Sequence, residues 1–97
     1  MATVLVADDD PGIRAFVTDL LTGEGYVVRC AEDGAAALAE VVRAPPDVVL
    51  SDVRMPRLDG LALAARLRPL GVPVVPKPFD ADALLAAVAA ALGAPVA

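Results

Sequence analysis

The chain has 97 residues, of which 58% are hydrophobic and 22% charged, so it can build one compact domain around one core. Its 8 basic and 13 acidic residues give a net charge of -5, which argues against direct binding to nucleic acid. The chain has a single cysteine, Cys30, and no histidine, which excludes an intramolecular disulfide and a zinc-finger site and favours a cytoplasmic location. No apolar tract reaches the roughly 20 residues that a membrane span needs.

The first predicted unit is a strand followed by a helix. Thr3–Ala7 is a short β-prone run of the kind found in strands buried on both faces of a parallel sheet. Asp10 suits the N-cap of a helix, and Pro11 suits its first position. The apolar side chains at helical spacing, which we expect to face the core, are Ile13, Phe16, Val17, Leu20 and Leu21.

The second unit repeats this order. After Gly23 and Gly25 end the first helix, Tyr26–Ala31 is predicted to be a strand in which Cys30 packs as a small buried hydrophobe. Gly34–Arg43 is predicted to be a helix that ends before two prolines. Its larger apolar contacts are expected to be Leu38, Val41 and Val42.

The second half of the chain continues the alternation. Asp47–Ser51 is predicted to be a strand, and Val72–Pro76 is too short to be anything else. The helix between them is expected to start at Asp59 and Gly60 and to stop at Pro69, with one shared face made of Leu61, Ala64, Ala65 and Arg68. Asp80 is predicted to cap a last helix whose apolar stripe is Leu84, Leu85, Val88 and Leu92. Strands that alternate with helices indicate an α/β fold with a doubly wound parallel sheet.

Acidic side chains follow two of the predicted strands. In an open parallel sheet, functional groups gather beyond the carboxyl ends of the strands. Asp8, Asp9 and Asp10 should therefore converge there with Asp52 and Lys77. These residues also have structural explanations. Acids favour the start of a helix, although Asp10 alone would serve that purpose. Asp52 could be an ordinary aspartate at a strand end, and Lys77 an ordinary solvated lysine in a turn. Clustered carboxylates repel one another, and Mg²⁺ relieves that repulsion while leaving positions open for phosphate oxygens. An aspartate beside Mg²⁺ and a lysine is equipped as a nucleophile toward a phosphoryl group.

Three stretches in order, "VLVADDDPGIR", "VVLSDVRMPRLDG" and "PKPF", resemble landmarks of the response-regulator receiver domain of two-component signalling. The resemblance implies that Asp8 and Asp9 position Mg²⁺, that Asp52 accepts the phosphoryl group and that Lys77 contacts it. It also implies that the backbone carbonyl of Arg54 completes the metal shell. The implied fold is the flavodoxin-like (CheY-like) one, and the implied partner is a sensor histidine kinase or a phosphotransfer protein.

The sequence departs from this family between Asp52 and Lys77, which are 25 positions apart (77 minus 52). A receiver ordinarily places two helices and two strands there, so about one β-α unit of 25 to 30 residues is missing. No Ser or Thr follows Asp52 to contact the phosphoryl group, and Val74 stands where an aromatic residue is expected three positions before the lysine. We therefore expect about four strands in order 2-1-3-4 with about four helices, and an edge position for the proline-flanked strand Val72–Pro76.

Three functions remain open at this point. The first is one receiver domain over residues 1–97, without an output domain, that acts as a phosphoacceptor rather than an enzyme. The second is a degenerate or engineered minimal receiver that binds metal but does not switch. The third is a phosphotransferase resembling haloacid dehalogenases, with Asp8 as nucleophile, although no cap or later acidic pair follows. The missing unit would also uncover apolar surface, from which we expect a homodimer.

Overall fold

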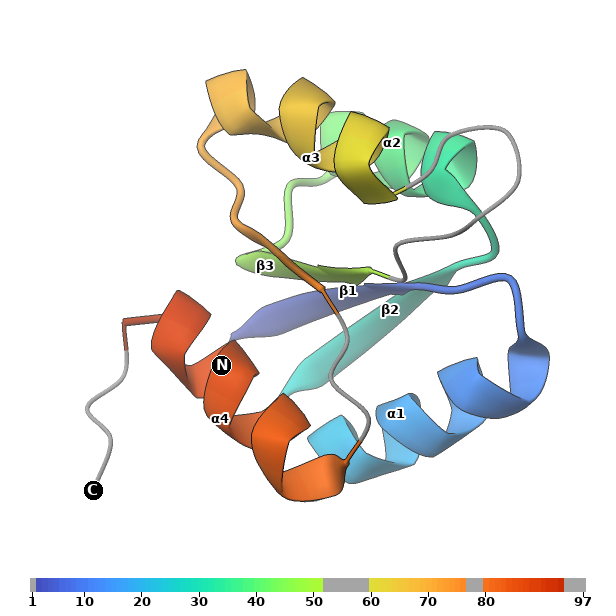
Figure 1. Ribbon diagram of the computed structural model, residues 1–97, viewed down its shortest axis with the longest axis vertical. Helices are drawn as coiled ribbons and strands as arrows, with labels where there is room; N and C mark the ends of the chain where they lie inside the picture. Colours follow the sequence, from blue (N-terminus) through green and yellow to red (C-terminus); the bar gives the residue numbers. More distant parts are fainter. Residues whose placement is uncertain (1, 52–59, 77–79, 94–97) are drawn as a thin grey trace.

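The computed structural model describes residues 2–51, 60–76 and 80–93 of the chain. Strands and helices alternate as predicted, in two layers of helices around one sheet (Figure 1). The elements are β1 (Thr3–Ala7), α1 (Pro11–Gly23), β2 (Val27–Ala31), α2 (Gly34–Arg43), β3 (Val48–Ser51), α3 (Gly60–Leu67), the 3-10 turn η1 (Arg68–Leu70), β4 (Val74–Pro76) and α4 (Ala81–Ala91).

Aspartate side chains start three of the helices. An Asp10 side-chain oxygen accepts hydrogen bonds from the backbone nitrogens of Gly12 and Ile13, at 2.8 and 3.3 Å. Asp80 caps α4 in the same way, and both caps were predicted from the sequence. Asp33 caps α2, which the sequence reading did not foresee, and its side chain is almost fully buried.

All four strands are parallel and lie in the order β2-β1-β3-β4, which confirms the predicted order. β1 pairs along its whole length with β2, and four of its residues pair with β3. β4 pairs with β3 through three residues only, from Val74 to Pro76. β1 and β3 are therefore the inner strands of the sheet, and β2 and β4 are its edges.

The prolines around β4 suit its edge position. The backbone nitrogen of Val49 donates to the carbonyl of Pro73 at 2.9 Å, so Pro73 meets β3 although it has no N–H of its own to donate. Successive residues of a strand direct their N–H groups to opposite sides, which puts the missing N–H of Pro76 on the open side of β4. β4 therefore pairs with β3 through few residues, and its open side lacks one of the N–H donors that another strand would need.

The core has one part on each face of the sheet. Leu5 and Val49 face α2 and α3, where they pack with Leu63 and Leu67. Val4, Val6, Val48 and Leu50 face the other side, where α1 and α4 cover them (Figure 1). Because β1 and β3 are covered on both faces, their residues form continuous apolar runs rather than alternating ones.

The predicted apolar faces of the helices are partly wrong. Val17 and Leu21 of α1 are buried, but Phe16 is 58% exposed because a position next to Val17 lies about 100° further around the helix. Ile13 and Val42 are also exposed. The largest error concerns α3, where Leu61 is 72% exposed while Leu63 and Leu67 are fully buried. Because α3 has leucines on nearly opposite sides, only its packing against the sheet decides which side is inside.

Cys30 is exposed, which corrects the prediction of a buried residue. It lies in β2, which is an edge strand, and its Sγ is 3.3 Å from the hydroxyl oxygen of Thr18 in α1. An edge strand has a neighbouring strand on one side only, so a side chain near its open edge remains in contact with solvent even where helices cover both faces.

Arg29 fastens β2 to the carboxyl end of α2. Its guanidinium donates to the carbonyl oxygens of Ala44 and Glu40, at 2.8 and 3.1 Å, and to the Glu40 carboxylate at 2.8 Å. Arg43 contacts the same carboxylate at 2.7 Å. Hydrogen bonds from Arg43 and then Arg29 lower the pKa of Glu40. The link gives a donor to the carbonyl of Ala44 at the end of the helix and a second donor to the carbonyl of Glu40, which also accepts from the backbone nitrogen of Ala44.

Candidate functional site

The carboxyl ends of the four strands form one row across the sheet. Ala7 is in register with Ala31 on one side and with Ser51 on the other, and Ser51 is in register with Pro76. Asp8 leaves the sheet directly after this row. Asp52 and Lys77 come next after Ser51 and Pro76 in the sequence, and both lie outside the described residues, as does Arg54. The carbonyl of Arg54 therefore stays a prediction, together with the roles of Asp52 and Lys77.

Asp8 is held firmly at the end of β1. Asp8 is 1% exposed, and its backbone nitrogen donates to the carbonyl of Ala31 at 3.1 Å. Its Oδ1 accepts a hydrogen bond from the backbone nitrogen of Asp10 at 2.9 Å. Asp9, by contrast, is exposed. The turn after β1 thus presents one buried and one exposed carboxyl group side by side in the chain.

The third acid of this run has a structural role. The carboxylate of Asp10 caps α1, so it serves the helix start. These roles agree with the prediction from the sequence that one aspartate is enough to start the helix, so that the presence of the other two requires a different explanation. Asp8 and Asp9 remain the candidates for binding a cation.

The oxygen donors of Asp8 and Asp9 are of the kind that Mg²⁺ prefers. Mg²⁺ is usually held by one or two carboxylates together with water and phosphate oxygens, so two acids at the end of β1 are a sufficient start for such a site. Within residues 2–51, 60–76 and 80–93, no three acidic, histidine or cysteine side chains gather closely enough to hold a metal. A complete site would therefore need the predicted ligands from the segment after β3.

Arg14 is a member of this site that the sequence reading missed. Its Nη1 donates to the backbone carbonyl of Asp8 at 2.7 Å. The sequence offers one signal for this role, which is a basic residue one turn into the helix that follows the acids. Its partner is a backbone atom, however, which no pattern of side chains reveals.

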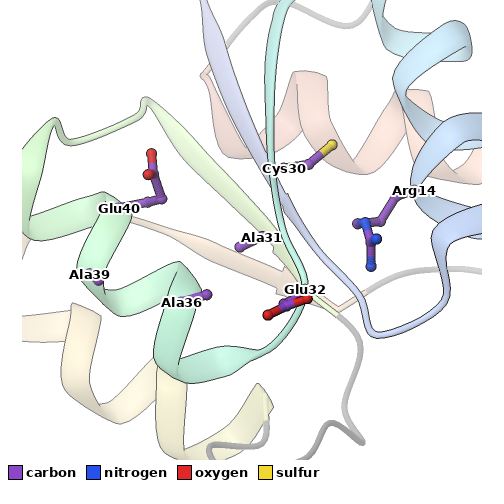
Figure 2. Close-up of a pocket in the computed structure, with 7 residues that line it drawn as sticks. All are labelled: Arg14, Cys30, Ala31, Glu32, Ala36, Ala39 and Glu40. Carbon is purple, nitrogen blue, oxygen red and sulfur yellow. The ribbon is translucent and has the colours of Figure 1, made fainter.

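An open pocket of about 530 Å³ lies beside Arg14 at the carboxyl end of β2. Figure 2 shows that its lining comes from both sides of that strand, with α1 on one side and α2 on the other. The lining residues are Arg14, Cys30, Ala31, Glu32, Ala36, Ala39 and Glu40. Two acids and one arginine give the pocket mixed charge, so it has no clear preference for an anion or a cation.

A family model described as "Response regulator receiver domain" matches residues 4–76, which include β1 through β4. The chain belongs to the response-regulator receiver family. Receiver domains act in two-component signalling, where they exchange signals with histidine kinases or phosphotransfer proteins. The sequence-based assignment of the family and of the flavodoxin-like fold is therefore confirmed.

Known receivers match this chain in sequence and in structure. Response regulator MprA of Mycobacterium leprae is 35% identical over 114 residues, which cover 92% of this chain and 50% of that protein. The chain thus spans half the length of this relative. Chemotaxis protein CheY4 of Vibrio cholerae superposes with a TM-score of 0.82 at 29% identity, over 95% of this chain and 99% of that one. The response regulator TrrA of Thermotoga maritima, solved in complex with Mg²⁺-BeF, gives 0.83 at 29% identity, over 95% of this chain and 100% of that one.

The MprA alignment also shows that this receiver is short. Its 114 positions hold only 92% of the 97 residues, or about 89, so about 25 positions of the relative face gaps in this chain. That difference is about the length of one β-α unit. Among the described elements, one strand follows β3. No helix in the described part of this receiver is long and apolar enough to cross a membrane.

Proposed function

We propose that this receiver accepts a phosphoryl group on Asp52 from the phosphohistidine of a sensor kinase or a phosphotransfer protein. The observation that carries the proposal is the buried Asp8 and the exposed Asp9 at the end of β1, in the row where β3 and β4 also end. Asp8, Asp9, Asp52 and the carbonyl of Arg54 would hold Mg²⁺, which neutralises charge on the phosphoryl oxygens when bound. Lys77 would contact the same oxygens.

The transfer itself needs only one nucleophile. A carboxylate oxygen of Asp52 attacks phosphorus, the P–N bond to the imidazole breaks, and the imidazole nitrogen leaves with the electron pair. An acyl phosphate results, so no water and no redox partner is consumed. The domain is therefore proposed as a signalling phosphoacceptor rather than an enzyme with a separate substrate.

Phosphoramidate, which carries the same P–N bond, tests this proposal without knowledge of the kinase. Incubation with Mg²⁺ should add one phosphoryl group by mass spectrometry, and peptide mapping after reduction of the acyl phosphate should locate it at Asp52. Asp52→Asn should abolish the modification, while Asp82→Asn, at an exposed acid in the first turn of α4, should leave it intact. Modification of the wild type elsewhere, or none at all, would contradict the proposal.

A receiver that binds metal but does not switch is the second candidate. Val74, which stands at the position where the family resemblance implies an aromatic residue, is half-buried and packs against the core facing α2 and α3. A small side chain held there cannot swing between a buried and an exposed rotamer as a large ring could. Amide spectra with and without Mg²⁺ and beryllofluoride separate the two candidates. Changes confined to the ends of β1 and β3 favour the static receiver, and changes that reach α4 favour a switch.

The phosphotransferase alternative would use Asp8 as its nucleophile. The burial of this residue and the hydrogen bond from Asp10 to its Oδ1 both limit its access to a substrate. Peptide mapping covers this case too, because modification of Asp8 in place of Asp52 would favour the phosphotransferase.

Homodimer formation is a further part of the proposal. β4 is an edge strand, and the neighbouring α3 and η1 expose Leu61 and Leu70, at 72% and 55%. Exposed leucines beside an edge offer an apolar contact surface, whereas the prolines of β4 make strand addition a poor route. Light scattering after size exclusion at several concentrations should show a species above 9.8 kDa that Leu61→Ser reduces. A monomer at every concentration would refute this part alone.

A further inference from the structure

Arg14 brackets the turn that carries the acids. Its backbone nitrogen donates to the carbonyl of Asp10 at 3.0 Å, as the first hydrogen bond of α1. Its Nη1 donates to the carbonyl of Asp8 at 2.7 Å. One residue therefore holds the turn at both ends, once through the main chain and once through the side chain.

The bond to Asp8 restricts Asp9 as well. The carbonyl of Asp8 and the amide nitrogen of Asp9 belong to one planar peptide group, so fixing the oxygen fixes the direction in which the chain enters Asp9. Asp8 itself is already held by its bonds to Ala31 and Asp10. Asp9 is exposed, and the Arg14 bond constrains the peptide group that leads into it.

We propose that Arg14 is a positioning residue for the cation site, which acts by fixing the Asp8–Asp9 peptide so that the two carboxylates hold a set relative position. This inference rests on the proposed Mg²⁺ site. Outer partners that orient metal ligands typically change metal affinity 10- to 100-fold when they are removed. We therefore expect Arg14→Ala to weaken Mg²⁺ binding by about tenfold.

The charge of Arg14 acts in the opposite direction. A guanidinium near a cation site repels the cation, so its removal would strengthen Mg²⁺ binding if charge were its main effect. The two effects differ in their response to salt. Repulsion between partly exposed charges is screened at about 0.5 M KCl, whereas the loss of a fixed geometry is not.

Calorimetric titration of the full chain with MgCl₂, at low salt and at about 0.5 M KCl, separates the two effects. Arg14→Ala should bind Mg²⁺ about tenfold more weakly than the wild type, with the larger loss at high salt. Arg14→Lys keeps the charge without the planar fork, so it should also bind more weakly. Arg66→Ala is the matched control, because it removes the same charge from an exposed position in the last turn of α3. It should stay within a factor of about two.

Amide hydrogen exchange in the metal-free chain gives a second readout. The Asp10 amide, which donates to Asp8, should exchange faster in Arg14→Ala while amides of β1 and β3 keep their protection. Equal or tighter Mg²⁺ binding by Arg14→Ala, or unchanged exchange at Asp10, would overturn the role of Arg14. If the wild type binds no Mg²⁺, the metal site itself is refuted and the positioning role falls with it. If the wild type binds Mg²⁺ and Arg14→Ala binds it equally well, the metal site stands and the positioning role alone fails.

Discussion

Replacement of Arg29 by methionine should destabilise the receiver more than any other substitution of an arginine in its described part. The side chain joins β2 to the end of α2 through three hydrogen bonds, to Ala44 and to the backbone and carboxylate of Glu40. Arg29→Met keeps the apolar stem of the side chain and removes all three bonds. The change therefore tests the link itself rather than the packing of the strand.

The expected loss can be worked out from these contacts. Three bonds from a charged donor that is 25% exposed are together worth about 3 kcal/mol. The Arg29 Nε is buried and finds no acceptor in the described part of the chain, so its removal returns about 1 kcal/mol. The net loss is about 2 kcal/mol, which for a domain of this size lowers the Tm by about 8 to 16 °C.

Thermal unfolding followed by circular dichroism measures this shift, and urea unfolding with an unchanged m-value shows that the folded state stays compact. Arg43→Met is the matched control, because Arg43 contacts the same carboxylate at 2.7 Å but is 66% exposed. Exposed ion pairs contribute little, so this control should unfold close to the wild type. Equal shifts for the two variants, or an Arg29→Met variant as stable as the wild type, would refute the reasoning.

Three further predictions concern the site and the core. Mg²⁺ at ten times its Kd should add about 1.4 kcal/mol to the free energy of unfolding. Asp9→Asn should abolish this gain and should raise the Tm measured in chelator, because it removes one of several acids that repel one another. Identical melting curves in Mg²⁺ and in chelator would exclude the metal site. The pKa of Glu40 is lowered, so its ionised carboxylate stabilises the folded state above the ordinary pKa of 4.5, and this stabilisation is lost as the pH falls through the lowered pKa. The Tm difference between wild type and Glu40→Gln should therefore close in acid. A difference that persists in acid would contradict this reasoning. Leu63→Ala should cost about 2 to 5 kcal/mol in urea unfolding, whereas Leu61→Ala should be nearly neutral, and the reverse order would mean that α3 faces the other way.

The sequence by itself determined the elements and their order. Local signals were enough for this: Asp10 with Pro11 marks the start of α1, Asp80 marks the start of α4, and the prolines near residue 45 close α2. The order 2-1-3-4 was predicted from the resemblance to the receiver family together with the short interval after Asp52, and the structure confirms it. The location of Asp8 and Asp9 at the end of β1 could also be predicted, because parallel strands deliver their carboxyl ends to one edge of the sheet, while their role as metal ligands stays a prediction.

Only the tertiary structure decided which side of each helix is inside and which partners lie far away in the chain. α3 is apolar on several sides, so the choice of Leu63 over Leu61 depends on the sheet it meets. Cys30 is exposed because β2 is an edge strand, which is a property of the whole sheet and not of its five residues. Arg14 and Arg29 act on backbone carbonyl groups, and every residue carries such a group. A pattern of side chains therefore cannot single out these partners, and they become definite only when the fold brings them within hydrogen-bonding distance.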